Sequence, residues 1–147
     1  MILTKSQIIF GNESYLYWVS LKGNFSTWKY VQRKEIYCLE MIEELNLLIV
    51  GGKTFSKLSY LGKSTHRSNI KIYNGGKTDK YEHLFTYDIP NCSKDHVTGL
   101  NYITTKPSGT KLLMVLTSSG ILTFLRVRSY NEIELFSQMN CMEIGIQ

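Results

Sequence analysis

The chain has 147 residues, of which 43% are hydrophobic and 20% are charged, and it carries a formal net charge of +5. This length predicts one domain, and this composition excludes a disordered chain. No apolar run reaches the roughly 20 residues that a membrane-spanning helix needs. The first residues lack the pattern of a secretion signal, so we expect no membrane span and a cytoplasmic or nuclear location.

Short apolar runs separated by turn residues follow one another along the chain, and this pattern predicts an all-β protein. No strand is expected before residue 7. The expected strands lie at residues 7–10, 14–20, 25–31, 35–41, 46–51, 69–74, 81–89, 97–104, 111–117, 121–128, 132–138 and 142–146.

These strands group into three similar units, at about residues 6–32, 35–89 and 97–138. The second and third units have four strands each, whereas the first lacks the opening strand of that set. A spare strand of the opening type is expected at about residues 141–147. Units of roughly 40–50 residues with four short strands are typical of β-propeller blades. An up-and-down barrel or a sandwich of short strands is the alternative.

The third unit carries a set of short motifs in a fixed order. Asp95-His96 opens it, the apolar Val97 and Leu100 follow, and Ser119-Gly120 closes its second hairpin. This order resembles the WD40 repeat, which has Gly-His, an alternating apolar strand and Asp-Gly at these places. The terminal Trp-Asp of that family is absent, and its side-chain hydrogen-bond network does not carry over. The resemblance implies a partial WD40-like β-propeller of about three blades, in which His96 has a structural role.

Three Gly-Lys-Ser or Gly-Lys-Thr sequences, which begin at Gly52, Gly62 and Gly76, invite comparison with phosphate-binding loops. None has the preceding glycine at the required spacing, so we expect no nucleotide cofactor. The histidines and cysteines show no metal-ligand spacing, and no nucleophile with a partner base stands out. The three cysteines are widely spaced, which favours reduced thiols. We therefore expect a protein that is not an enzyme and that holds neither a metal nor a cofactor.

The longest interruption of the repeat, at residues 53–68, is the candidate binding surface. It contains four basic residues and no Asp or Glu. In a propeller, this link and the link before the third unit emerge on the same face, which adds one more lysine. Such a surface suits nucleic acid or another anionic partner, and an ordinary solvated loop is the alternative. The expected binding residues are Lys53, Lys57, Lys63, Arg67 and Lys94.

Three blades cannot close a propeller ring, because known rings have about four to eight. Two apolar faces would stay uncovered, and such faces mark interfaces. We therefore expect a protein-protein interaction scaffold, a subunit of a larger complex. The spare strand has Met142, Ile144 and Ile146 at alternate positions. By strand addition, it is expected to complete the first unit of a second copy, as a homodimer, or of another propeller fragment.

Overall fold

The computed structural model describes residues 1–22, 26–31, 35–53, 57–58, 64–65, 67–75, 82–93 and 95–142. Its strands form three four-stranded antiparallel sheets and one two-stranded sheet. Within these residues there is no α-helix, and the only helical turn is the 3-10 segment η1, Glu43–Leu45. No helix in this part of the chain is long and apolar enough to cross a membrane. The expected all-β fold is confirmed.

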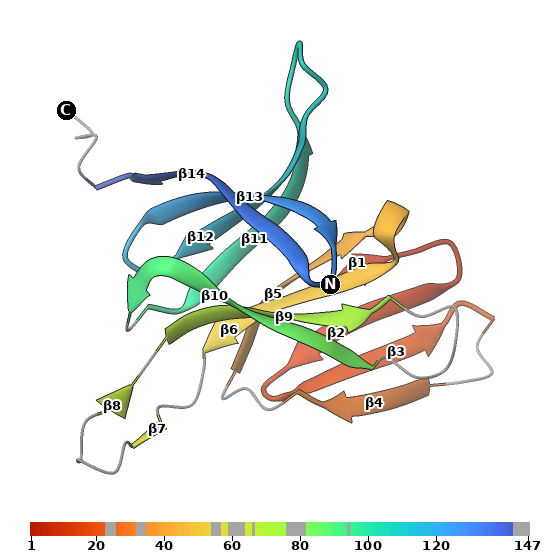
Figure 1. The fold of residues 1–147 in the computed structure, drawn as a ribbon. Helices are drawn as coiled ribbons and strands as arrows, with labels where there is room; N and C mark the ends of the chain where they lie inside the picture. Colours follow the sequence, from red (N-terminus) through yellow and green to blue (C-terminus); the bar gives the residue numbers. More distant parts are fainter. Residues whose placement is uncertain are drawn as a thin grey trace.

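Each large sheet is built from strands that follow one another in the chain (Figure 1). Sheet 1 has the order β1 (Ile2–Leu3), β2 (Gln7–Asn12), β3 (Tyr15–Ser20) and β4 (Ser26–Tyr30). Sheet 2 has the order β5 (Glu35–Ile42), β6 (Leu47–Lys53), β9 (Arg67–Asn74) and β10 (His83–Ser93). Sheet 3 has the order β11 (Val97–Thr104), β12 (Lys111–Thr117), β13 (Ile121–Ser129) and β14 (Glu132–Asn140). The small sheet pairs β7 (Lys57–Leu58) with β8 (Ser64–Thr65).

Two expectations about the strands were wrong. A strand does precede Gln7, because Ile2 and Leu3 pair with β2, so the first sheet has four strands rather than three. A strand of two residues shows no alternation, which is why the sequence pattern misses it. The interruption after Lys53 is not only a loop, because β7 and β8 pair within it.

The spare strand at residues 141–147 is not observed in the described part of the chain. Cys141 and Met142 lie in a turn after β14, and residues 143–147 lie outside the described residues. The extra strand at this end therefore stays a prediction.

The hydrophobic core consists of two clusters, one at each junction between neighbouring sheets. Ile9 and Trp18 of sheet 1 are buried with Leu48 and Val50 of sheet 2. Ile49, which lies between these two residues of β6, is buried instead in the cluster between sheets 2 and 3. Alternate residues of β6 thus fill opposite junctions, so this strand is apolar throughout its first four residues. Sheet 2 is covered on both faces.

A glycine permits close approach of the sheets at each junction. A Cβ atom at Gly11 of β2 would lie 2.6 Å from Cγ2 of Ile36, in sheet 2. A Cβ atom at Gly51 of β6 would lie 2.6 Å from Cγ1 of Val97, in sheet 3. Ile36 and Val97 occupy the same place, because each is the last paired residue before the β-bulge in the first strand of its sheet. The two junctions are therefore built in the same way.

The three sheets follow one another without closing a ring. Sheet 1 packs on sheet 2 mainly through β1, β2 and β5, and sheet 2 packs on sheet 3 mainly through β5, β6 and β11. Figure 1 shows sheet 2 between the other two. The outer faces of sheets 1 and 3 are left without a sheet against them in the part of the chain that the structure describes.

Candidate functional site

The structure describes only part of the basic surface expected after β6. Lys53 ends β6 and is half-buried. Lys57 begins β7 and Arg67 begins β9, but their side chains lie outside the described residues, as do Lys63 and Lys94 entirely. Four of the five side chains lie outside the described residues, so their arrangement is not tested and anionic binding at this surface stays a prediction.

His96 belongs to a hydrogen-bonded connection at the start of sheet 3. Its backbone N–H donates to Oγ of Ser118 over 3.0 Å, and its carbonyl accepts the N–H of Ser118 over 2.8 Å. The neighbouring Asp95 carboxylate accepts hydrogen bonds from the hydroxyls of Thr117, over 3.4 Å, and Ser119. Its carbonyl accepts a hydrogen bond from Oγ of Ser68 over 2.5 Å, which links this segment to sheet 2. These bonds fix the link between sheets 2 and 3 to the β12–β13 turn.

Met142 follows β14 and lies against the same turn. Its side chain is 75% exposed, and its Cγ would lie 3.1 Å from a Cβ placed at Gly120. The N–H of Cys141 donates to the carbonyl of Gly120 over 2.9 Å. The other two residues predicted for a pairing strand, Ile144 and Ile146, lie outside the described residues.

The three cysteines, Cys38, Cys92 and Cys141, are free thiols, and Cys92 is buried. Burial raises the pKa of the Cys92 thiol, and the nearby carboxylate of Asp95 raises it further. A thiol that keeps its proton is a poor nucleophile and a poor metal ligand. In the described residues, no group of three or more His, Cys, Asp or Glu side chains is placed to hold a metal.

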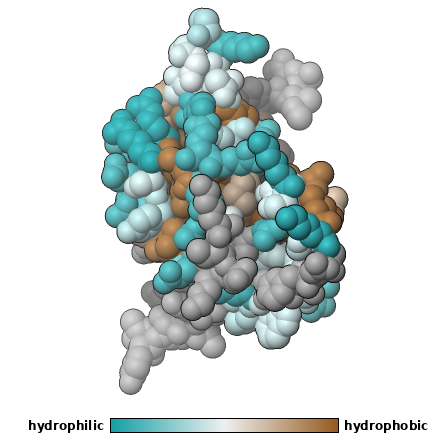
Figure 2. Space-filling view, turned by 90° about the vertical axis from the view of Figure 1, so that its right-hand side faces the viewer, coloured by the Kyte–Doolittle hydropathy of each residue, from teal (hydrophilic) through white to brown (hydrophobic). Residues whose placement is uncertain are grey.

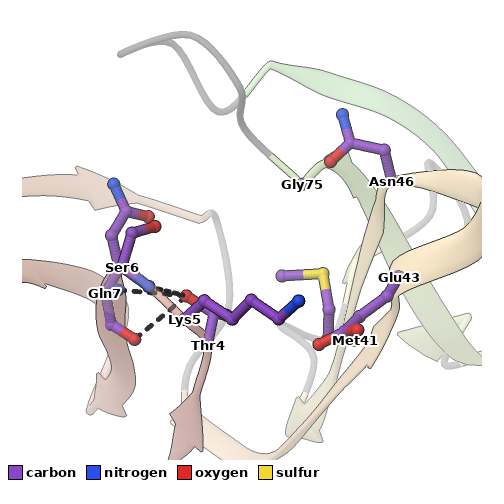
Figure 3. Close-up of a pocket in the computed structure, with 8 residues that line it drawn as sticks. All are labelled: Thr4, Lys5, Ser6, Gln7, Met41, Glu43, Asn46 and Gly75. Atoms are coloured by element: carbon purple, nitrogen blue, oxygen red, sulfur yellow. Dashed lines mark hydrogen bonds between the residues drawn. The ribbon is translucent and has the colours of Figure 1, made fainter.

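A polar hollow of about 250 Å³ lies where the β1–β2 link meets the end of sheet 2 (Figure 3). Thr4 shapes its wall, because its hydroxyl accepts the N–H of Gln7 over 3.0 Å. Figure 3 shows the Lys5 side chain stretched toward Met41 and Glu43. Its lining is a mixed set of one cation, one carboxylate, hydroxyls and amides, which can hold a small polar group. The lining residues are Thr4, Lys5, Ser6, Gln7, Met41, Glu43, Asn46 and Gly75.

The outer face of sheet 1 carries a cluster of aromatic side chains, which we call the aromatic face. The rings of Phe10 and Tyr17 stack with centroids 5.2 Å apart. Tyr15 contacts Trp28 edge-on at 5.6 Å and Tyr30 at 5.5 Å. The Trp28 side chain is 64% exposed, and a shallow hollow of about 280 Å³ is lined by Tyr15, Tyr17 and Trp28. The side of the molecule that lies to the right in Figure 1 is shown in Figure 2, where apolar residues reach the surface between hydrophilic ones.

The outer face of sheet 3 is aliphatic around Leu116, and we call it the Leu116 face. Leu116 of β12 and Met139 of β14 are exposed. Both pair with Leu122 of β13, so the three side chains share one face. Phe136 is exposed as well, and the guanidinium of Arg126 lies over its ring at 5.4 Å from the centroid.

Sequence reasoning predicted uncovered faces but not these side chains. The run Tyr15, Leu16, Tyr17, Trp18 indicates an exposed pair of tyrosines, because alternate residues of a strand point to opposite faces. Leu16 and Trp18 are buried toward sheet 2, so the two tyrosines point away from it. Both faces of this strand are apolar, so periodicity alone cannot tell which one is covered.

The comparisons with known proteins add no relative. No protein-family model matches the chain, and the search of curated proteins found no similar sequence. Proposals about function therefore depend on the geometry of the two outer faces.

Proposed function

We propose that this chain is a non-catalytic protein-protein interaction module, a subunit of an assembly in which another chain or a second copy covers its end sheets. One observation carries the proposal: the outer faces are apolar at the positions that are buried at the inner junctions. Ile8 and Phe10 of β2 stand where Leu48 and Val50 stand in β6, next to the glycine of the junction. In β6 those side chains are fully buried against a neighbouring sheet.

The composition of the aromatic face supports a macromolecular partner, because contiguous exposed apolar side chains mark interaction sites. Tyr and Trp are enriched at interfaces, because one rigid side chain combines a large apolar area with a polar tip. A flat group of rings with a shallow hollow suits the side chains of a second protein surface.

A WD40-like β-propeller, completed in the assembly, is the architecture we favour. Three successive four-stranded antiparallel sheets, packed face to face in chain order, support it. So does the repeated contact of an opening strand with a glycine of the preceding sheet.

The open edge of sheet 1 supports completion by another strand. β5 and β11 each pair with their neighbour over seven positions, whereas β1 pairs with β2 at Ile8 and Ile9 alone. Phe10–Asn12 of β2 pair with no described strand on this edge, and unpaired strand edges attract such additions. The predicted strand at residues 142–146 of a second copy is one candidate.

The assembly state tests the proposal. The chain mass is 17.0 kDa. We expect light scattering to give a larger mass, either for the purified chain or for the complex that contains it in its native source. Deletion of residues 141–147 tests the strand addition. A monodisperse species of the chain mass in both preparations, with native strand content by circular dichroism, would refute the proposal.

A further inference from the structure

The two outer faces differ from the inner junctions at one corresponding position. At the inner junctions, a β-branched side chain of one sheet, Ile36 or Val97, lies on a glycine of the preceding sheet. In sheet 3 the residue at the place of Gly51 is Leu116. The pairing registers establish this, because Gly51 pairs with Cys38, the first paired residue after the β-bulge in β5, and Leu116 pairs with Gly99, the first after the β-bulge in β11.

Leu116 excludes a further sheet of the same kind on sheet 3. A lone Cβ atom at Gly51 would already lie 2.6 Å from Val97, far inside the usual contact of about 3.5–4.0 Å. A leucine adds three more carbon atoms at this place. A sheet that brought a β-branched residue here, as sheets 2 and 3 do, would overlap with the Leu116 side chain, which is 38% exposed.

Sheet 1 has the opposite irregularity. β1 pairs with Ile8 and Ile9 of β2. These two residues correspond to Leu48 and Ile49 of β6, which pair with the last part of β5. No described residue of sheet 1 therefore stands at the place of Ile36 or Val97. Among the described residues, the outer side of sheet 1 therefore carries no side chain that would overlap with Leu116.

We propose that the aromatic face of one copy packs on the Leu116 face of a second copy, with Leu116 in the space that Ile36 and Val97 fill at the inner junctions. This inference rests on the proposed function and names its partner. The extra volume on one face matches the missing volume on the other, as a close-packed interface requires. Methionine side chains on the Leu116 face suit contact with aromatic rings. The Leu116 face also carries Arg126, which lies over the Phe136 ring and pairs in register with Glu134, so opposite charges are close together on this face.

The area available favours a closed pair of copies. A face of four strands, each about six residues long, covers about 20 by 20 Å, or roughly 400 Å², and the face of sheet 1 is somewhat smaller because β1 has two residues. A stable interface needs about 800 Å² per partner. Two copies joined head to tail bury both end faces of each chain, which approaches that area, whereas a single junction gives about half of it. The three sheets of each copy would then follow one another around a ring with two-fold symmetry.

Two substitutions on different faces test the pairing. Trp28→Lys alters the aromatic face and Leu116→Glu alters the Leu116 face, and both side chains are exposed, so the fold should persist. We expect light scattering to give twice 17.0 kDa for the natural chain and 17.0 kDa for each variant. A mixture of the two variants should recover the double mass, because it rebuilds one natural junction and sets Lys against Glu at the other. Tyr130→Lys, an exposed aromatic in the β13–β14 turn, is the matched control and should remain paired.

The other outcomes overturn the inference in distinguishable ways. If light scattering gives 17.0 kDa for the natural chain, a second copy is not the partner. The proposed function then holds only if the chain is found in a larger complex in its native source. A pair that tolerates Leu116→Glu, or variants that fail to recover on mixing, refutes this pair of faces. Loss of pairing on deletion of residues 143–147, with Leu116→Glu still paired, assigns the association to strand addition instead. Circular dichroism of each variant excludes unfolding as the cause.

Discussion

Replacing Gly11 by alanine tests whether the sheets meet through a glycine contact. The new Cβ atom would lie 2.6 Å from Cγ2 of Ile36, about 1 Å closer than carbon atoms normally approach. Overpacking of this kind costs about 1–3 kcal/mol. Alanine is favoured over glycine in a strand by about 0.5–1 kcal/mol, which offsets part of the loss. We expect a net loss of about 1–2 kcal/mol in the free energy of unfolding.

Thermal unfolding followed by circular dichroism measures this loss. For a chain of this size, 1 kcal/mol shifts the Tm by about 2–4 °C, so Gly11→Ala should lower it by about 2–8 °C. Gly99→Ala is the matched control, because its Cβ atom would lie 3.4 Å from Cβ of Leu116, an ordinary contact. Ile36→Ala removes the atom that clashes, so the double variant should be more stable than the two single losses predict. Strict additivity, or an equal loss in Gly11→Ala and Gly99→Ala, would refute the glycine contact.

Three further predictions concern burial, hydrogen bonding and pH. Trp18→Ala should lower the free energy of unfolding in urea by about 3–5 kcal/mol, because this side chain is 3% exposed. Trp28→Ala, measured at low protein concentration, should lower it by less than about 1 kcal/mol. Similar losses in the two variants would contradict the assignment of faces. Gln138→Ala should cost about 1–3 kcal/mol, because its amide joins β14 to β13 and to sheet 2 through hydrogen bonds of 2.8–2.9 Å, and an unchanged urea midpoint would contradict this. Burial raises the pKa of the Cys92 thiol above 9.0 and of the Tyr102 hydroxyl above 10.0, so the unfolded chain loses these protons first. Stability from these groups is complete below pH 9 and is lost as the pH rises through the folded-state pKa values; an unfolding midpoint that stays constant to pH 10.5 would contradict this.

The strands were predictable where alternation is strong and turns are tight. β11 and β12 begin and end at the predicted residues, because apolar runs there are bounded by turn sequences. β1 could not be predicted, since two residues carry no period and its pairing depends on the fold. β7 and β8 are equally short and contain a single apolar residue, Leu58, so their sequence is typical of a loop.

The candidate site was less predictable than the fold. The number of repeated units predicted that the end faces would be uncovered. The side chains that form those faces could be assigned only from the pairing registers. Nothing local in the sequence distinguishes Leu116 from an ordinary strand residue. The difference becomes visible only when β12 is aligned with β6 through the pairing registers, because Gly51 stands at the same position in β6. The basic surface after β6 shows the reverse case, since its residues are obvious in the sequence while most of their side chains lie outside the described residues.

Coverage of sheet 1 links assembly to stability. Sheet 2 has neighbours on both faces and a first strand that pairs over seven positions, whereas sheet 1 has one described neighbour and a first strand that pairs over two. The stability of sheet 1 therefore depends on the junction that includes Trp18 and on whatever covers Tyr15 and Trp28. A partner that binds only the folded state adds RT ln(1 + [partner]/Kd) to the free energy of unfolding. If a second copy is that partner, the Tm of the natural chain must rise with its concentration, and the Tm of Leu116→Glu must not.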